Sequence, residues 1–298
     1  MSMPLVTVVI PCYNHEKYIQ DCIQSVINQR YRNIELIIID DGSTDNSVEK
    51  IKEMLIMCQE RFLKFEFRTR VNKGVSATLN EALYWASGKY ISPIASDDQM
   101  LPNKIKMQVE ELEQDTSLVA VFGGIHQIDE RNNIVRTLKK PRTIYSFDDI
   151  AKFLCFLQAP TQLIRTNILR KIGGYNQSYK IEDWSSYLQL TRFGNFLLLP
   201  DVLALYRRHP NNSSKNIELM HEKIKIMQDL NLSPKDMNYY MSFIYLSLAS
   251  DCALGHKKQS FLYLIRSVVL NKSIILKKRF LIVFIKNIMP SRFLSKNK

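Results

Sequence analysis

Short strand-like runs alternate with segments whose apolar residues recur at helical spacing through the first 122 residues of the chain. The runs are rich in Val, Ile and Phe, and lie at 5–10, 34–40, 64–68, 89–95 and 118–122. Strands have this composition. Strands that alternate with helices form parallel sheets with crossover helices on their faces. The order therefore predicts an α/β fold with a doubly wound, mostly parallel sheet flanked by helices.

Polar clusters follow three of these runs. "PCYN" (11–14) comes after the first run, "DDGSTD" (40–45) ends the second, and "SDD" (96–98) follows the fourth. In doubly wound sheets, ligands bind beyond the carboxyl ends of the strands. The three clusters therefore fall on one edge of the sheet, and we expect them to form one binding site there.

The adjacent carboxylates of Asp97 and Asp98 suit a divalent cation. Hard oxygen ligands favour Mg²⁺ or Mn²⁺, and such ions fill their remaining positions with substrate phosphates and water. The chain has neither a G-x-x-x-x-G-K-[ST] loop nor a G-x-G-x-x-G after the first strand. A bound diphosphate would therefore need the metal to neutralise it. The alternative is that the pair lies in a solvated turn.

Two further acidic pairs have both a functional and a structural interpretation. Asp40 and Asp41 offer a carboxylate to an N–H group of a nucleotide base, and Tyr13 offers an aromatic face on which a base could stack. The alternative for one of these aspartates is that it only organises the turn after its strand. Glu182 and Asp183 open a predicted helix, where acids are also stabilised by the helix dipole.

Three stretches of the chain, 6–47, 72–98 and 172–184, resemble glycosyltransferase family 2 enzymes of the GT-A fold in order and spacing. They contain the three polar clusters and the Glu-Asp pair, and the resemblance covers about residues 5–210. It implies an inverting transferase that moves a hexosyl or N-acetylhexosaminyl group from a nucleotide-diphosphate sugar, with a UDP-sugar favoured. It also implies Mn²⁺ or Mg²⁺ as the cofactor.

The resemblance assigns donor-binding roles to five residues. Pro11, Tyr13 and Asp41 match the positions that hold the nucleotide base. Asp97 matches the carboxylate that faces the ribose or the sugar, and Asp98 matches the metal ligand. On this basis Asp98 would bind the cation and Asp97 the sugar nucleotide.

The resemblance assigns the role of general base to Asp183. Its carboxylate would remove the proton of the acceptor hydroxyl as that oxygen attacks the anomeric carbon from the face opposite the leaving group. Ser185 stands where the family often has a second Asp, which leaves Asp183 as the base. The polar loop 206–214 contains His209, to which the sequence assigns no role.

Two departures from the family pattern concern the donor site. Many members read Asp-x-Asp-Asp where this chain has Ala95-Ser96-Asp97-Asp98, so the first carboxylate is missing and metal binding depends on Asp98. Leu79 precedes Asn80 where a common pattern has Arg, which puts one phosphate or packing contact in doubt.

The net charge of +12 comes almost entirely from the C-terminal segment. Residues 257–298 contain 11 Lys and Arg and no Asp or Glu, whereas the preceding 256 residues hold 30 basic and 29 acidic side chains. The apolar run 280–285 is far shorter than the roughly 20 residues that a membrane span needs. Basic and apolar composition predicts a segment that lies on an anionic membrane surface. One alternative is that the segment is a helix packed on its own domain. Nucleic-acid binding is a weaker alternative, because the segment has few polar residues that could read bases.

The resemblance implies a GT-A domain over 1–214, with a nucleotide-sugar half (1–122) and an acceptor half (123–214). The sequence that follows predicts a basic helical extension over 215–298. Five scattered cysteines and the lack of a signal peptide predict a cytoplasmic protein. We expect it on the inner face of the cytoplasmic membrane, where it would glycosylate a lipid-linked saccharide of a bacterial surface polysaccharide such as lipopolysaccharide O-antigen or capsule. A nucleotidyltransferase of related fold would need a Gly-rich, Arg-containing loop after the first strand, and the residues there, "PCYNHEKY" (11–18), include no glycine. A non-catalytic module that binds sugar nucleotides or membranes is the other alternative.

Overall fold

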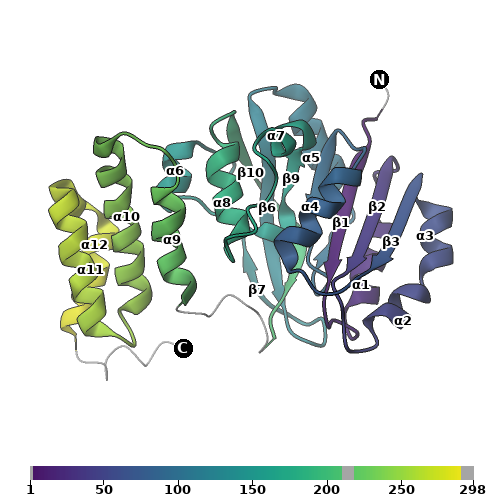
Figure 1. Ribbon diagram of the computed structural model, residues 1–298, viewed down its shortest axis with the longest axis horizontal. Helices are drawn as coiled ribbons and strands as arrows, with labels where there is room; N and C mark the ends of the chain where they lie inside the picture. Colours follow the sequence, from purple (N-terminus) through teal and green to yellow (C-terminus); the bar gives the residue numbers. More distant parts are fainter. Residues whose placement is uncertain (1–2, 210–217, 290–298) are drawn as a thin grey trace. The chain divides into compact units, whose positions relative to one another are not determined.

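The computed structural model describes residues 3–209 and 218–289 (Figure 1). Contacts divide the chain into two compact units. Unit 1 comprises Met1–Phe147 and Phe156–Ser213, and unit 2 comprises Asp148–Cys155 and Ser214–Lys298. Residues 148–155, expected in the first domain, are thus grouped with the C-terminal helices.

Ten strands form one sheet among the described residues of unit 1, in the order β3-β2-β1-β4-β9-β6-β10-β5, with β7 beside β6 and β8 beside β10. The strands are β1 (Val6–Cys12), β2 (Ile34–Asp40), β3 (Lys64–Thr69), β4 (Tyr90–Pro93), β5 (Gln99–Met100), β6 (Leu118–Ile128), β7 (Ile134–Leu138), β8 (Thr143–Tyr145), β9 (Leu163–Arg165) and β10 (Asn195–Arg207). Their number and order confirm the predicted α/β fold.

The N-terminal half of this sheet is parallel. β1 pairs in parallel with β2 and β4, and β2 with β3 (Figure 1). All seven residues of β2 are buried, because helices cover both faces of a parallel sheet. β9 runs antiparallel to both β4 and β6 and joins this half to the parallel pair of β6 and β10.

The helices of unit 1 connect these strands. They are α1 (Ile19–Ile27), α2 (Ser47–Lys52), α3 (Leu55–Arg61), α4 (Val75–Trp85), α5 (Lys104–Gln114), the 3-10 turn η1 (Ala159–Thr161), α7 (Thr166–Lys171) and α8 (Glu182–Leu190). In α1, Ile19, Cys22, Ile23 and Val26 recur at helical spacing and are buried in the core. The amphipathic pattern of the sequence thus sets the face that α1 packs in the core.

Three strands end at the same edge of the sheet. The last residue of β1, Cys12, pairs with the last residue of β2, Asp40, and Val9 pairs with Pro93 at the end of β4. The Asp41 N–H group then donates to the Cys12 carbonyl at 2.8 Å. This register brings the three polar clusters together, as the strand pattern predicts.

Unit 2 is helical over its described residues, which confirms a helical C-terminal part. It contains α9 (Glu218–Gln228), α10 (Pro234–Cys252), α11 (Lys257–Leu270), the 3-10 turn η3 (Lys272–Leu276) and α12 (Lys278–Ile288), and α6 (Phe147–Ala151) spans the junction of the units. α10 begins at a Ser233 cap followed by Pro234, both favourable for a helix start. Among the helices that the structure describes, none is long and apolar enough to cross a membrane.

Candidate active site

A cavity of about 780 Å³ lies where β1, β2 and β4 end. Pro11, Tyr13 and Asp41, the residues predicted to hold a nucleotide base, all line it. Ser96 and His209 line another part of its wall. The structure therefore brings together side chains from both ends of unit 1 at the predicted edge of the sheet.

The carboxylate of Asp41 is held in the cavity wall by the loop that precedes α4. Its Oδ1 accepts from the Lys73 N–H group (2.9 Å) and its Oδ2 from the Gly74 N–H group (2.8 Å). The Arg70 guanidinium lies 2.5 Å from Asp41 Oδ1. These partners hold the carboxylate of Asp41 in the cavity wall.

Asp40, unlike Asp41, accepts hydrogen bonds from the turn that follows β2. Its Oδ1 accepts from the N–H groups of Gly42 (3.2 Å) and Ser43 (2.9 Å), and its Oδ2 accepts from the Ser43 hydroxyl (2.5 Å). Gly42 adopts a left-handed φ of 79°, which this turn requires and which Gly tolerates best. Asp40 is thus the aspartate of this pair that organises the turn.

Tyr13 presents its ring to the cavity and is 48% exposed. Its neighbour Asn14 ties the loop to the next one: the Asn14 N–H group donates to Ser43 Oγ (2.9 Å), and Asn14 Oδ1 accepts from the Thr44 N–H group (2.8 Å). The ring is therefore open to a stacking partner, while the backbone that carries it is held in place.

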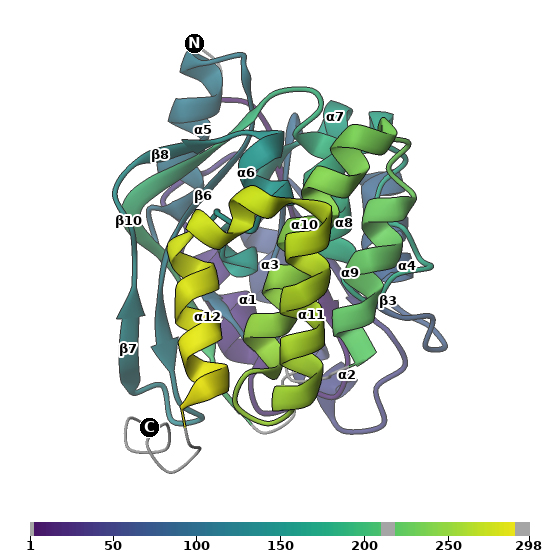
Figure 2. The same cartoon turned by 90° about the vertical axis from the view of Figure 1, so that its left-hand side faces the viewer.

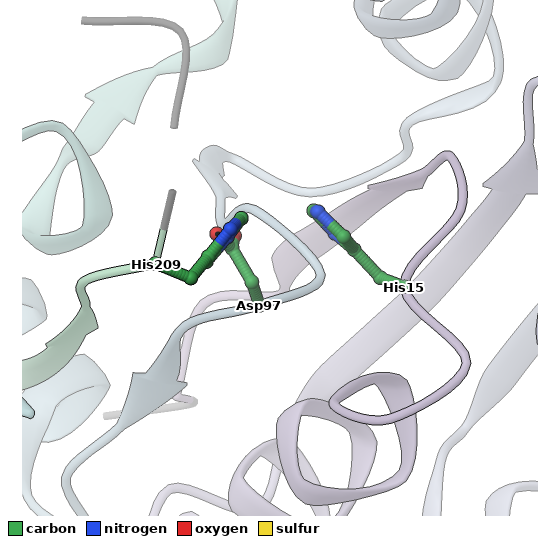
Figure 3. Close-up of side chains that lie close together, drawn as sticks. All are labelled: His15, Asp97 and His209. Carbon is green, nitrogen blue, oxygen red and sulfur yellow. Dashed lines mark hydrogen bonds and ion pairs between the residues drawn. The ribbon is translucent and has the colours of Figure 1, made fainter. Parts of the chain in front are cut away.

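His15, Asp97 and His209 form a compact group at the cavity, and their side chains point toward one another (Figure 3). One ligand atom of each lies within 4.8 Å of those of the other two. His209 Nε2 is 2.9 Å from Asp97 Oδ2, and His15 Nδ1 is 2.7 Å from Ser96 Oγ. Burial lowers the pKa of His15, although the Asp97 charge partly opposes the shift. A neutral imidazole is the form that binds metal ions.

Asp98 lies in a different environment from Asp97. It is buried, and its Oδ1 accepts from the Arg207 backbone N–H group at 2.9 Å. Burial, followed by the charge of Asp97, raises the pKa of Asp98 well above its ordinary value. Among the described residues, the group with metal-ligand spacing contains Asp97 and not Asp98. The role of metal ligand for Asp98 stays a prediction.

Arg207, the last residue of β10, holds the loop that carries Asp97 and Asp98 through hydrogen bonds. The guanidinium is fully buried; its Nε donates to the Asp97 carbonyl (2.9 Å), and a terminal nitrogen donates to the Asp129 carbonyl (3.0 Å). It lies 4.6 Å from the centre of the Tyr18 ring, which in turn stacks on His209 with 5.6 Å between ring centroids. Arg207 thus connects the aspartate loop with the His209 ring.

Asp183 lies at the start of α8, as predicted, and its Oδ1 accepts from the Trp184 N–H group at 2.6 Å. Burial raises the pKa of Asp183. A carboxylate with a raised pKa is a stronger base, which suits proton abstraction. Asp183 is not among the described residues that line the cavity.

The loop before α8 is attached to α4. Asn80 Nδ2 donates to the Tyr175 carbonyl (2.7 Å), and the Tyr175 N–H group donates to Asn80 Oδ1 (2.8 Å). Gly174 has a φ of 77°, and a Cβ added there would lie 2.4 Å from Asn80 Oδ1. The neighbouring Leu79, which stands where a common family pattern has Arg, is buried. Its side chain therefore contributes to packing.

The two histidines of this group were not predicted as site residues from the sequence: His15 was not identified as a candidate, and His209 had no assigned role. Both follow strands that end at the cavity edge, β1 and β10, and that position was the available signal. The pairing of His209 with Asp97 joins residues 112 positions apart, which no local pattern encodes.

Comparisons with known proteins agree with this arrangement. Residues 7–212 match the family described as Glycosyl transferase family 2. An uncharacterized glycosyltransferase of Haemophilus influenzae is 29% identical over 257 residues, which is 83% of this chain and 77% of that protein.

Two solved structures share the fold at low sequence identity. S. aureus TarS 1-349, in complex with UDP-GlcNAc, superposes with a TM-score of 0.67 at 16% identity, over 98% of this chain and 90% of TarS 1-349. The mannosyltransferase PcManGT of Pyrobaculum calidifontis, in complex with GDP-Man and Mn²⁺, gives 0.63 at 14% identity, over 99% and 89% of the two chains.

Proposed function

The chain belongs to glycosyl transferase family 2, and we propose that it is an inverting, metal-dependent enzyme that transfers a sugar from a UDP-sugar to an acceptor hydroxyl. The observation that carries this proposal is the cavity itself. Its lining includes Tyr13 and Asp41, which suit a nucleotide base, and His15 and His209, which form with the buried Asp97 a group that suits a cation beside a diphosphate.

The base of the nucleotide would stack on the exposed ring of Tyr13 beside Pro11. A ring N–H group of the base would donate to the carboxylate of Asp41, which Arg70 and two backbone N–H groups hold in place. TarS in complex with UDP-GlcNAc has the same fold, which supports a UDP-sugar as the donor.

His15, Asp97 and His209 would hold the divalent cation. One carboxylate and two imidazoles within 4.8 Å fit such an ion. Mg²⁺ prefers oxygen ligands, whereas transition-metal ions also accept imidazole, so this donor set favours Mn²⁺ over Mg²⁺ and also suits Zn²⁺. When bound, the ion would neutralise charge on the diphosphate leaving group. Asp98, to which the resemblance gives this role, would instead fix the loop through Arg207.

Asp183 would act as the general base. Its burial raises its pKa, so the carboxylate can accept the proton of the acceptor hydroxyl while that oxygen attacks the anomeric carbon. The attack and the departure occur on opposite faces of the sugar, so the configuration inverts. Asn80 would position Asp183 indirectly, because it attaches the loop that leads into α8.

The acceptor we propose is a lipid-linked saccharide of a bacterial surface polysaccharide, glycosylated at the cytoplasmic face of the membrane. The basic composition of residues 257–298, which suits an anionic membrane surface, supports a lipid-linked acceptor. The alternative is a protein that binds sugar nucleotides without catalysis, for which Asp183 would be dispensable.

The test is a screen of UDP-, GDP- and dTDP-sugars for release of the nucleoside diphosphate, with Mn²⁺, Mg²⁺ or Zn²⁺ and a bacterial lipid extract as the acceptor source. We expect release from one UDP-sugar with Mn²⁺, and its loss in Asp183→Asn. Donor binding without release under every condition, unchanged in that variant, would favour the binding module.

A further inference from the structure

The helix α12 of unit 2 turns polar residues inward. The Arg279 guanidinium donates to Ser247 Oγ on α10 (3.3 Å), and Asn287 Nδ2 donates to Ser260 Oγ on α11 (2.8 Å). Between them lies Val283, the buried residue of α12. Positions 279, 283 and 287 are four apart and share one face of the helix. A helix on a water-soluble domain normally buries its apolar stripe, and α12 does the opposite.

The outward side of α12 is apolar. Six of its large hydrophobic side chains, including that of the residue that ends it, are each at least 37% exposed: Leu281, Ile282, Phe284, Ile285, Ile288 and Met289. The 3-10 turn before it adds Ile275 and Leu276, of which Leu276 is 87% exposed. Such a run of exposed apolar side chains marks an interaction surface.

The adjacent helix α11 continues this apolar side. Phe261, Leu262, Ile265 and Val269 are exposed along it. A hollow of about 550 Å³ is lined by Phe261 and Leu262 of α11 and by Ile288 of α12, so the two apolar sides are continuous. Figure 2 shows α11 and α12 side by side.

Exposed basic residues alternate with these apolar side chains along α11, η3 and α12. Lys258, Arg266, Lys272, Lys277 and Lys278 are exposed, and residues 257–298 contain no Asp or Glu. We name the exposed side of α11, η3 and α12 the basic apolar face.

We propose that the basic apolar face is a docking surface for an anionic lipid bilayer. The bilayer supplies both partners that this face lacks: anionic headgroups for the lysines and a hydrocarbon boundary for the leucine, isoleucine and phenylalanine side chains. A second copy of the chain would bring like charges together, since the face carries exposed basic residues and no acid. The inference goes beyond sugar transfer and depends on no substrate or metal.

The experiment is sedimentation of the full chain with vesicles of phosphatidylcholine, with or without phosphatidylglycerol. We expect binding to the vesicles that contain phosphatidylglycerol at low salt, and release near 0.5 M salt, where the screening length falls to about 4 Å. We expect little binding to pure phosphatidylcholine. Because this assay needs no donor or acceptor, its result is independent of the test of the transferase activity.

Two triple variants test the two components of the face. Leu281→Gln/Ile285→Gln/Ile288→Gln should weaken vesicle binding at least about tenfold, because it removes apolar area from the bilayer contact. Lys258→Gln/Lys272→Gln/Lys278→Gln should weaken it by about 10²-fold, since each lysine near an anionic surface contributes a factor of roughly five.

Matched control variants carry the same substitutions on exposed residues of unit 1. They are Ile134→Gln/Val135→Gln/Ile144→Gln and Lys106→Gln/Lys139→Gln/Lys140→Gln. Both should bind vesicles like the parent, and circular dichroism should show all variants folded, because the changed side chains are exposed.

Three outcomes would overturn the proposal. The parent could fail to bind anionic vesicles at low salt, or the unit 1 controls could lose binding as much as the face variants. Alternatively, analytical ultracentrifugation could show a dimer that the apolar triple variant abolishes, with no lipid binding, and the face would then belong to a second copy.

Discussion

The carboxylate of Asp98 accepts a hydrogen bond from the Arg207 backbone N–H group at 2.9 Å, whereas its chain neighbour Asp97 lies 2.9 Å from His209. The two adjacent aspartates therefore face different partners. Asp98 links the loop after β4 to the end of β10, and Asp97 joins the two histidines at the cavity. Their partners differ, but the repulsion between the two carboxylates remains, because burial and the charge of Asp97 raise the pKa of Asp98.

Asp97→Asn should weaken Mn²⁺ binding by more than the roughly 10–100-fold typical of losing an outer-shell partner, because it removes a direct ligand. Asp98→Asn should leave Mn²⁺ binding nearly unchanged, since an amide oxygen can still accept from the Arg207 N–H group. The measurement is a Mn²⁺ titration followed by electron paramagnetic resonance in the presence of UDP. If Asp98→Asn loses as much affinity as Asp97→Asn, Asp98 is a ligand, as the family resemblance implies.

Asp183→Asn should lower turnover by about 10²–10⁴-fold, the usual contribution of a positioned general base, and leave donor affinity near that of the parent. Single-turnover kinetics and UDP binding by calorimetry separate the two quantities. Glu182→Gln, one residue away at the start of the same helix, is the matched control and should retain activity. A variant pair with the opposite result would move the base to Glu182.

The contact between Asn80 and the loop before α8 can be tested with two adjacent glycines. Gly173 and Gly174 both have a positive φ, but an added Cβ meets nothing within 4 Å at Gly173 and lies 2.4 Å from Asn80 Oδ1 at Gly174. Gly173→Ala should cost about 1–2 kcal/mol of unfolding free energy from backbone strain alone. Gly174→Ala should cost about 1–3 kcal/mol more, because the clash displaces the loop.

A double-mutant cycle supplies the control for this clash. Combining Gly174→Ala with Asn80→Ala should be less destabilising than the sum of the two single changes, because the second removes the atom with which the new Cβ collides. Urea denaturation gives the free energies. Strict additivity would mean that the two positions do not interact.

The strands that shape the cavity could be predicted because buried parallel strands appear in a sequence as apolar, β-branched runs. β1 and β2 have this composition, and β4 lies in the largely apolar run 89–95. The polar residues directly after these strands line the cavity or border it. Parallel register alone then brings Tyr13 and Asp41 together. These parts of the site required no information about long-range contacts.

Other parts of the site depend on contacts that a local pattern does not contain. β9 and β5 have three and two residues, too few for any periodicity to appear. His209 reaches the cavity because β10 pairs in parallel with β6, with shifts of register between Leu198 and Ala204. Those shifts decide which residue at the end of β10 faces Asp97, and they arise from tertiary packing.

Asp41→Ala should weaken donor binding by about 10–100-fold, the loss expected for a hydrogen bond to a charged group, with a smaller effect on turnover, because the contact to the base is the same in ground and transition states. Calorimetry with UDP and GDP measures it. Arg70→Met is the control, since it removes the ion pair at 2.5 Å and leaves the carboxylate. Equal losses for UDP and GDP, matched by Arg70→Met, would mean that Asp41 only shapes the loop.

Lys104, at the start of α5, provides a prediction for the pH dependence of stability. It is fully buried, and its Nζ donates to Ser92 Oγ (2.7 Å) and to the Gln162 carbonyl (3.0 Å). Burial lowers the pKa of Lys104 to about 7, whereas the pKa of a lysine in the unfolded chain is about 10.4. Between these two values the unfolded state binds more protons, so the free energy of unfolding rises with pH in this window.

Lys104→Met lacks this titration. The stability of the parent relative to Lys104→Met should therefore increase by about 1.5 kcal/mol between pH 7.0 and 8.5, on the linkage relation for a group with these two pKa values. Urea denaturation of both proteins at each pH gives the difference, and the contributions of cysteines and tyrosines cancel because both proteins contain them. A difference that stays constant across this range would mean that the buried amine keeps its proton, held by the Ser92 hydroxyl and the Gln162 carbonyl.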